Sequence, residues 1–549
     1  MRRVLIAVTL ALGIAGAWVA APGSRVVEIY PREGMVKPGE AVHLEVRVER
    51  VWYDPRPVTV MITRGLEKAP VATLTTRGGA ALEWAPPAAG GYGVTARIGR
   101  SQAATAVDAG ENWAAKPRYG FLSDFAPTDK GQAERFDRMA RYHINGLQFY
   151  DWHYRHSDYL PPTPEYRDPL GRLLSRDVLL EKLSQSHQHG MAAMAYTAVY
   201  AAPKEFADAH KEWGLYNAGG APLNFGDGFL YIMNPEAGSP WAAYTVDQYR
   251  KIVTDLPFDG IHLDQFGDPR MGFRYPGREG GTVDVATAFR SLIDATKDAV
   301  APRPVLFNDV GAWSLQDTAD TKKDAVYIEV WPPYNYFDHL QLLIGEGRRR
   351  SGGKPVVLAA YIKPENTAAV LLSDAVIFAA GGYHLELGEG AGILADPYFP
   401  KYQQPSAELA EHLRRYYDVI VRYQDLLYAP DLVDWAPDVT IADTRVLNGG
   451  YFNGVWPVGR SNDRYGILHL INLNGLTDAK WNGAHKTAPP VLEKRAVTVA
   501  MAKAPGAVYL ISPDDPDQSP VPVRFTYKDG QVQLTLERLA YWDLLVFEK

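Results

Sequence analysis

Between residues 119 and 381 the chain alternates short apolar runs with stretches of helical pattern, and this alternation constrains the fold most. The runs are short and largely apolar, which is typical of strands buried in a parallel sheet. Eight of them occur, at 119–124, 144–150, 191–196, 260–264, 304–308, 325–329, 355–361 and 375–381. Helical patterns separate several of the runs, at 131–142, 175–187, 241–256 and 284–300. A strand–helix alternation repeated eight times predicts a central (β/α)8 TIM barrel.

The chain of 549 residues is too long for one core, and its two ends have a different rhythm. In residues 25–110, apolar Val42, Leu44, Val46 and Val48 alternate with polar residues, which predicts strands with one solvated face. Frequent Pro and Gly turns between such strands favour an immunoglobulin-like β-sandwich. The same alternation of apolar and polar residues returns in residues 431–549, which predicts a C-terminal antiparallel β-sandwich. The barrel is therefore expected over residues 115–430.

The N-terminus has the features of an export signal. Two arginines are followed by an uncharged run from Val4 to Ala21 that ends in small residues, which predicts a secretory signal peptide over residues 1–21. An uncleaved membrane anchor is the alternative. A secreted or periplasmic protein is expected, with no membrane contact once the signal is cleaved. The chain has no cysteine, so it can form no disulfide, and its net charge of −7 argues against a nucleic-acid partner.

Two of the predicted strands end in a carboxylate. Asp264 closes the fourth and Glu329 the sixth, so both should lie at the mouth of the barrel. Hydrolysis of a glycosidic bond requires a pair of carboxyl groups placed in this way. Asp264 precedes a polar turn that favours the ionised form, whereas Glu329 lies among apolar residues that favour the protonated form. We therefore assign Asp264 as nucleophile and Glu329 as acid/base; helix capping or pairing with an arginine is the alternative for each.

Two other aspartates compete for the role of nucleophile. Asp259 precedes the apolar run and should lie at the wrong end of the barrel, whereas Asp268 lies in the loop four residues after Asp264. The rest of the predicted rim is rich in groups that bind hydroxyls, and ordinary loop hydrogen bonding is their alternative role. The expected substrate-binding residues are Asp151, Trp152, His153, Asn308, Trp331, Tyr361, His384 and Glu386. No metal or other cofactor is expected, because the spacing of Asp151, His153 and His156 matches no familiar ligand set.

Several long segments resemble glycoside hydrolase family 66, the dextranases and cycloisomaltooligosaccharide glucanotransferases. The resemblance is strongest at 142–156, 234–241, around Asp264 and Glu329, and at 381–389, 398–400 and 469–473. It implies an endo-acting, retaining α-1,6-glucanase on a barrel between two β domains, with Asp264 as nucleophile and Glu329 as acid/base. The implied partners are dextran and isomaltooligosaccharides, and a monomer is expected.

The same resemblance also bears on whether the chain hydrolyses dextran or cyclises its fragments. The glucanotransferases of the family carry an extra carbohydrate-binding module in the catalytic region, and this chain has no stretch of about ninety residues left over for one. Hydrolysis of dextran to isomaltooligosaccharides is therefore favoured over cyclisation. A non-catalytic α-glucan-binding protein is a further alternative.

Overall fold

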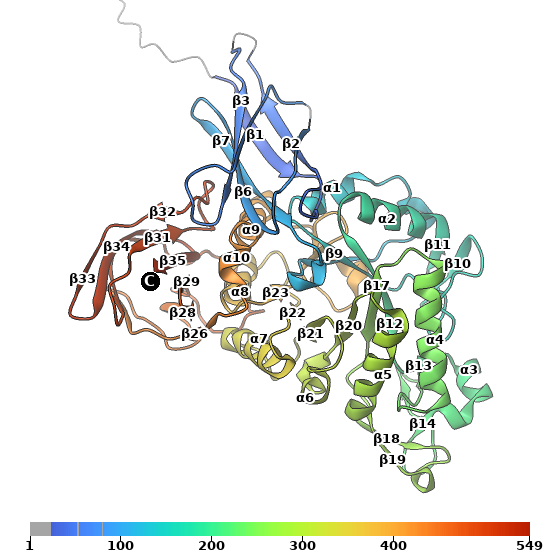
Figure 1. Ribbon diagram of the computed structural model, residues 1–549. Coiled ribbons are helices and arrows are strands. Elements are labelled where there is room, and N and C mark those ends of the chain that lie inside the picture. The colour runs from blue at the N-terminus through green and yellow to red at the C-terminus, as the bar shows by residue number, and fades with distance from the viewer. Residues whose placement is uncertain (1–22, 52–53, 80) are drawn as a thin grey trace, which may run out of the picture.

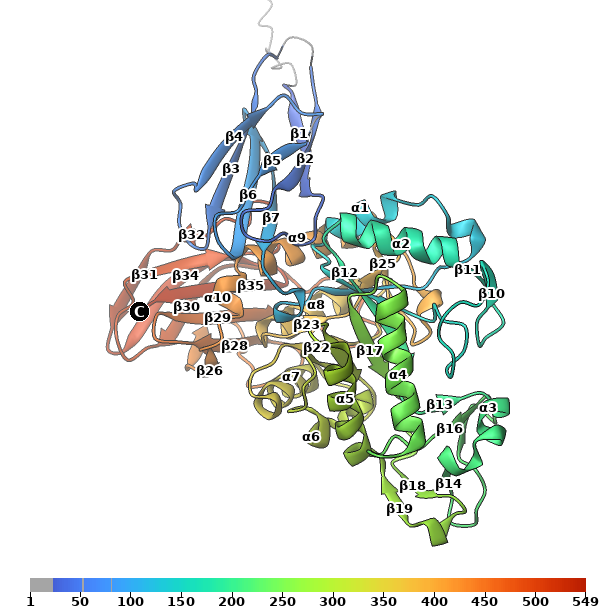
Figure 2. The same cartoon turned by 45° about the vertical axis from the view of Figure 1, so that its right-hand side comes forward.

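The computed structural model describes residues 23–51, 54–79 and 81–549. The protein is multidomain and mostly β, and its largest element is a curled sheet of ten strands. Figures 1 and 2 show the N-terminal strands (blue) standing above this sheet and the C-terminal strands (red) beside it. The predicted signal peptide lies outside the described residues. Within them, no helix is both long and apolar enough to cross a bilayer.

The N-terminal strands form two sheets that share one core. One has the order β1 (Arg25–Pro31), β2 (Val42–Glu49) and β5 (Leu82–Trp84), and the other β4 (Ala72–Thr76), β3 (Val58–Arg64), β6 (Gly90–Ile98) and β7 (Ser101–Ala109). The period of two in β2 buries Val42, Leu44 and Val46 on one face. These side chains pack with Val60 and Val94 of the other sheet.

The central sheet contains seven of the eight predicted strands. Its parallel strands are β8 (Tyr119–Leu122), β9 (Gly146–Phe149), β12 (Ala192–Ala198), β17 (Gly260–Asp264), β20 (Val305–Asn308), β21 (Ala325–Glu329), β22 (Val356–Ala359) and β23 (Tyr383–His384). The sheet then returns to its start, because β24 (Leu387–Gly388) pairs with β8 and with β25 (Gly392–Ile393). Segment 383–388 thus pairs with both β22 and β8.

The eighth strand was predicted in the wrong place. Residues 375–379 belong to helix α8 (Thr367–Ala379), and the strand begins only at Tyr383. All residues of α8 from Ala368 to Ala379 are buried. An apolar run buried on every side has no polar face, so its periodicity cannot separate a helix from a buried strand.

Helices lie outside the curled sheet (Figure 1). The main ones before α8 are α1 (Glu134–Ala140), α2 (Arg176–Gln188), α4 (Pro240–Asp255), α5 (Val285–Val300) and α7 (Phe337–Ser351). The side chains of Ser175, Ser239 and Asp284 cap α2, α4 and α5 by accepting backbone N–H bonds at their starts. Shorter elements occupy the connections: α3 (Lys204–Ala209), α6 (Leu315–Thr318), β10 (Glu165–Arg167), β11 (Leu173–Ser175), β13 (Ala201–Ala202), β14 (Leu215–Tyr216), β15 (Asn224–Phe225), β16 (Leu230–Ile232), β18 (Met271–Arg274) and β19 (Thr282–Asp284).

The C-terminal strands also form two sheets. One has the order β26 (Val433–Trp435), β28 (Val455–Ser461), β29 (Tyr465–Asn472), β35 (Trp542–Glu548), β31 (Ala507–Ile511) and β32 (Val521–Pro522). The other has the order β27 (Val439–Ile441), β30 (Leu492–Ala500), β34 (Gln531–Leu539) and β33 (Phe525–Lys528). Leu468 and Leu545 of the first sheet pack with the second, whereas Ile467 and Val546 belong to the core of the central region.

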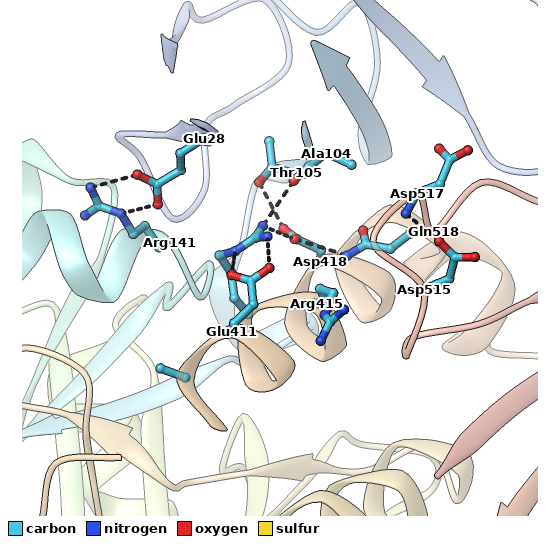
Figure 3. Close-up of polar contacts among 12 residues, drawn as sticks. Glu28, Ala104, Thr105, Arg141, Glu411, Arg415, Asp418, Asp515, Asp517 and Gln518 are labelled. Atoms are coloured by element: carbon cyan, nitrogen blue, oxygen red, sulfur yellow. Dashed lines mark hydrogen bonds and ion pairs between the residues drawn. The ribbon is translucent and has the colours of Figure 1, made fainter. Parts of the chain in front are cut away.

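Helix α9 (Ala407–Arg422), followed by α10 (Gln424–Leu427), joins the three regions (Figure 3). The Oδ1 atom of the fully buried Asp418 accepts a hydrogen bond of 2.9 Å from Thr105 in β7 and lies 2.8 Å from His143 Nε2. Its Oδ2 atom accepts bonds from Arg414 at 2.7 Å and from Gln518 of the C-terminal region at 3.4 Å. One carboxylate therefore links N-terminal, central and C-terminal segments.

Candidate active site

Asp264 and Glu329 are the last residues of β17 and β21, as predicted. Only β20 lies between these two strands, and it ends at Asn308. Because neighbouring parallel strands end at the same edge of a sheet, the three side chains meet there. The apolar residues before each carboxylate are buried, which fixes the position of the strand end.

Asn308 bridges the two carboxylates. Its Nδ2 atom donates hydrogen bonds of 2.7 Å to Asp264 Oδ1 and 3.0 Å to Glu329 Oε2. Since both oxygens bond to one nitrogen, they cannot lie further apart than these two bonds placed end to end. That limit is below the roughly 6.5–9.5 Å between the carboxyl groups of an inverting glycosidase and compatible with the roughly 5–5.5 Å of a retaining one.

Each carboxylate has a tyrosine as a second donor. The Tyr196 hydroxyl donates to Asp264 Oδ2 at 2.7 Å, and the Tyr361 hydroxyl donates to Glu329 Oε1 at 2.6 Å. The sequence-based expectation that only Asp264 has polar surroundings is therefore wrong. Polar donors hold both carboxylates in similar ways, and the local environment alone does not assign the two roles.

Burial raises the pKa of both carboxyl groups. It raises the pKa of Asp264 to about 7, and repulsion from Glu329 is the next cause. Burial is also the main cause of the raised pKa of Glu329, against which the hydrogen bonds from Tyr361 and Asn308 act. Two carboxyl groups that repel each other at this distance titrate as a pair, so the second proton is lost at a higher pH than the first.

A cavity of about 560 Å³, here called the first cavity, opens onto the pair. Asp264, Glu329, Asp151 and Trp331 line it, as predicted. Asp151 has a left-handed φ of 51°, is buried, and lies 3.5 Å from Arg172. Burial raises its pKa to about 7. The aromatic lining is formed by Tyr150, His156, Tyr196, Phe225, Phe229, Phe266, Trp331 and Tyr398.

Six of the eight predicted substrate-binding residues are not in this lining. Asn308 and Tyr361 bond to the two carboxylates instead, and the other four are buried. Trp152 is fully buried in the core, where its indole N–H donates to the Tyr196 carbonyl at 3.1 Å. His153 is fully buried behind His156, and burial lowers its pKa. His384 and Glu386 are buried with Asp374 of α8. These four side chains are buried away from the cavity, so they do not line it.

Asp374, His384 and Glu386 form a group whose ligand atoms lie within 4.8 Å of one another. The two ring nitrogens of His384 are already engaged: Nδ1 lies 2.8 Å from Asp374 Oδ1, and Nε2 lies 3.0 Å from the Ala360 carbonyl oxygen. The ring therefore has no free lone pair for an ion. Burial raises the pKa of Asp374 to about 7 and that of Glu386 well above its ordinary value, so shared protons fit this group better than a metal does.

The two competing aspartates lie apart from the pair. The Asp259 carboxylate accepts a bond of 2.7 Å from the Ala193 N–H and lies 2.9 Å from His187, at the opposite end of β17 from Asp264. Asp268 is exposed and lines a neighbouring cavity but not the first one. Neither belongs to the hydrogen-bonded group of Asp264, Asn308 and Glu329.

Sequence reasoning missed Tyr196, Tyr150, His156, Tyr398 and Gln265, all of which line the first cavity. A usable signal existed for Tyr196, since it was the last residue of the third predicted strand, where inward-facing residues reach the rim. Sequence reasoning also missed the buried ion pair next to Asn308. The following residue, Asp309, forms a fully buried ion pair of 2.6 Å with Lys323 and accepts a hydrogen bond of 2.8 Å from Ser314.

A pair of carboxyl groups at this spacing, held by an amide and two tyrosines beside a cavity with aromatic walls, is the type of site that cleaves glycosidic bonds. The comparison with family models agrees. Residues 34–546 match the model of glycosyl hydrolase family 66, and the chain belongs to this family.

The relatives carry two different names. A cycloisomaltooligosaccharide glucanotransferase of Niallia circulans is 24% identical over 84% of this chain and 64% of its own length. A dextranase of Streptococcus salivarius is 23% identical over 80% of this chain and 64% of its own length. The chain thus spans a little under two thirds of the curated relatives that it matches.

Solved structures show the same fold. The crystal structure of a Paenibacillus cycloisomaltooligosaccharide glucanotransferase complexed with cycloisomaltoheptaose has a TM-score of 0.88, at 22% identity over 95% of this chain and 99% of that one. A maltogenic α-amylase from Thermotoga neapolitana has a TM-score of 0.51, at 14% identity over 79% of this chain and 100% of that one.

Proposed function

We propose that this protein is a retaining, endo-acting hydrolase of α-1,6-glucan, a dextranase that releases isomaltooligosaccharides. The observation that carries the proposal is the Asn308 bridge, which holds Asp264 and Glu329 at a spacing suited to a covalent intermediate. Membership of family 66 and the names of the relatives supply the substrate class.

The mechanism follows from one proton shared by the pair. Glu329 gives its proton to the glycosidic oxygen while the Asp264 carboxylate attacks the anomeric carbon. The bond to the leaving sugar breaks, and a glycosyl ester of Asp264 forms. Glu329, now ionised, takes a proton from water, whose oxygen attacks the same carbon and releases Asp264. Asn308 and Tyr196 hold the nucleophile in place through both steps.

Hydrolysis is favoured over cyclisation by the lengths of the alignments. The alignments with two Niallia circulans glucanotransferases extend over 628 and 635 positions, more than the 549 residues of this chain, so these relatives carry segments that it lacks. The alignment with the dextranase extends over 533 positions and 80% of this chain, so it too includes segments that the chain lacks, but fewer of them. The transglycosylating cyclase is the second candidate, favoured by the likeness of the fold to a glucanotransferase.

Product analysis on dextran tests the proposal. We expect new reducing ends and linear isomaltooligosaccharides, and no reducing ends from pullulan, starch or mutan. Asp264→Asn and Glu329→Gln are the matched inactive controls. Cyclic products would favour the cyclase, and binding without release of reducing ends would favour a non-catalytic α-glucan-binding protein.

We further infer the architecture around the site. The curled sheet is interpreted as a (β/α)8 barrel over residues 115–430, supported by its parallel order and by the pairing of β24 with β8. The flanking sheets are interpreted as an immunoglobulin-like sandwich over 25–110 and a C-terminal sandwich over 431–549. Export through a signal peptide over residues 1–21 and a monomeric state complete the proposal. N-terminal sequencing of the exported protein and light scattering test the last two points.

A further inference from the structure

A second cavity, of about 370 Å³, adjoins the first. The two share Val310 and Trp331 as a common wall. The second cavity is lined from the loops that follow β17, β20 and β21, the three strands that carry Asp264, Asn308 and Glu329. A polymer bound across the carboxylate pair can therefore continue from one cavity into the other.

The lining of the second cavity suits a sugar. Trp313, Trp331 and Tyr334 supply aromatic rings, and Trp331 is 39% exposed. Asp268 and Arg270 are exposed polar groups on the same cavity, and the Arg270 guanidinium lies 5.4 Å from the centre of the Trp313 ring. Aromatic rings accept the apolar faces of sugar rings, while a few placed polar groups bind their hydroxyls.

The C-terminal region holds this wall in place. The indole N–H of Trp481 donates to the Tyr334 carbonyl at 2.8 Å, and the Phe337 N–H donates to the Ala479 carbonyl at 3.0 Å. Trp481 itself is buried. The segment that follows Trp331 is thus fixed from outside the central sheet, and a surface fixed before binding loses less entropy when it takes a ligand.

We propose that the second cavity binds the glucosyl units on the reducing-end side of the bond that is cleaved. The inference rests on the proposed function and adds the direction of the substrate. An acid that protonates the glycosidic oxygen must lie beside the leaving sugar. Glu329 is two residues from Trp331, the wall that leads into the second cavity. The part of the first cavity around Asp151, His156 and Tyr398 then takes the non-reducing-end units. On this assignment Asp268, which lines the second cavity, binds the reducing-end units and is not the nucleophile.

Cleavage of isomaltohexaose labelled at its reducing end tests this direction. Trp313→Ala and, separately, Arg270→Ala should weaken binding of the reducing-end units, so the substrate shifts and the labelled product becomes shorter than with the wild type. Tyr398→Ala, on the opposite side of the pair, should make the labelled product longer. On dextran, Trp313→Ala should lower kcat/KM about tenfold, which corresponds to roughly 1.4 kcal/mol.

The outcomes are distinct. An unchanged or longer labelled product from both Trp313→Ala and Arg270→Ala overturns the inference while the proposed function stands. Arg270 is exposed, so Arg270→Ala should fold normally. It therefore tests the inference by itself if Trp313→Ala fails to fold. A folded wild type that leaves both isomaltohexaose and dextran intact overturns the proposed function and the inference with it.

Discussion

The hydroxyl of Tyr361 donates a hydrogen bond of 2.6 Å to Glu329 Oε1. This bond favours the ionised carboxylate, so it lowers the pKa of Glu329 against the effect of burial. In Tyr361→Phe the pKa should rise, and Glu329 should keep its proton to higher pH. We expect the basic limb of kcat/KM on dextran to move upward by up to about one pH unit. Tyr527→Phe, in the C-terminal region, is the control; a basic limb that stays in place would contradict the role of this bond.

Glu329→Gln should change the titration of Asp264. Repulsion from Glu329 is the second cause of the raised Asp264 pKa, and glutamine removes that charge. The pKa of Asp264, followed directly by carboxyl NMR titration, should move to lower pH, and with an aryl isomaltoside, whose leaving group needs no acid, the first step should persist. An Asp264 pKa that stays in place or moves upward would show that the two groups do not interact as described.

Asp264→Asn should abolish activity and stabilise the fold at alkaline pH. The pKa of Asp264 is about 7 in the folded protein and lies near 3.9 in an unfolded chain, so ionising it costs folding free energy. The penalty is absent below about pH 4, grows as the pH rises, and is complete above about pH 7. We expect a gain of up to about 4 kcal/mol at pH 8 and none at pH 4, measured by denaturant unfolding. A gain that is equal at both pH values would contradict the raised pKa.

Lys323→Met should destabilise the protein strongly. Lys323 pairs with Asp309 at 2.6 Å with both side chains fully buried, so the variant leaves an uncompensated charge beside Asn308. The expected cost is roughly 3–5 kcal/mol, with recovery in Lys323→Met/Asp309→Asn. The neighbouring Lys322 pairs with Asp298 at the surface at 2.7 Å, and Lys322→Met should cost less than about 1 kcal/mol. Equal effects of the two single variants would contradict this account.

The strand ends were the most predictable part of the site. Asp264 and Glu329 each end a short apolar run, and a strand buried on both faces has to stop where the chain becomes polar. The eighth strand was not predictable in this way, since α8 is as apolar as the strands around it. The direction in which a side chain at the rim points could not be predicted from the sequence either. His384 and Glu386 are two residues apart and share a face, but that face packs on Asp374. Packing between distant segments decides such orientations.

The stereochemistry of azide rescue tests the central assignment most directly. In Asp264→Gly, azide should attack from the face that the carboxylate vacated while Glu329 still protonates the leaving sugar, and the glycosyl azide should have inverted configuration. In Glu329→Gln, supplied with a substrate that has a good leaving group, azide should open the glycosyl ester of Asp264 and give the retained configuration. The opposite pattern would exchange the two roles, and rescue of neither variant, with Asp268→Asn inactive, would move the nucleophile to Asp268.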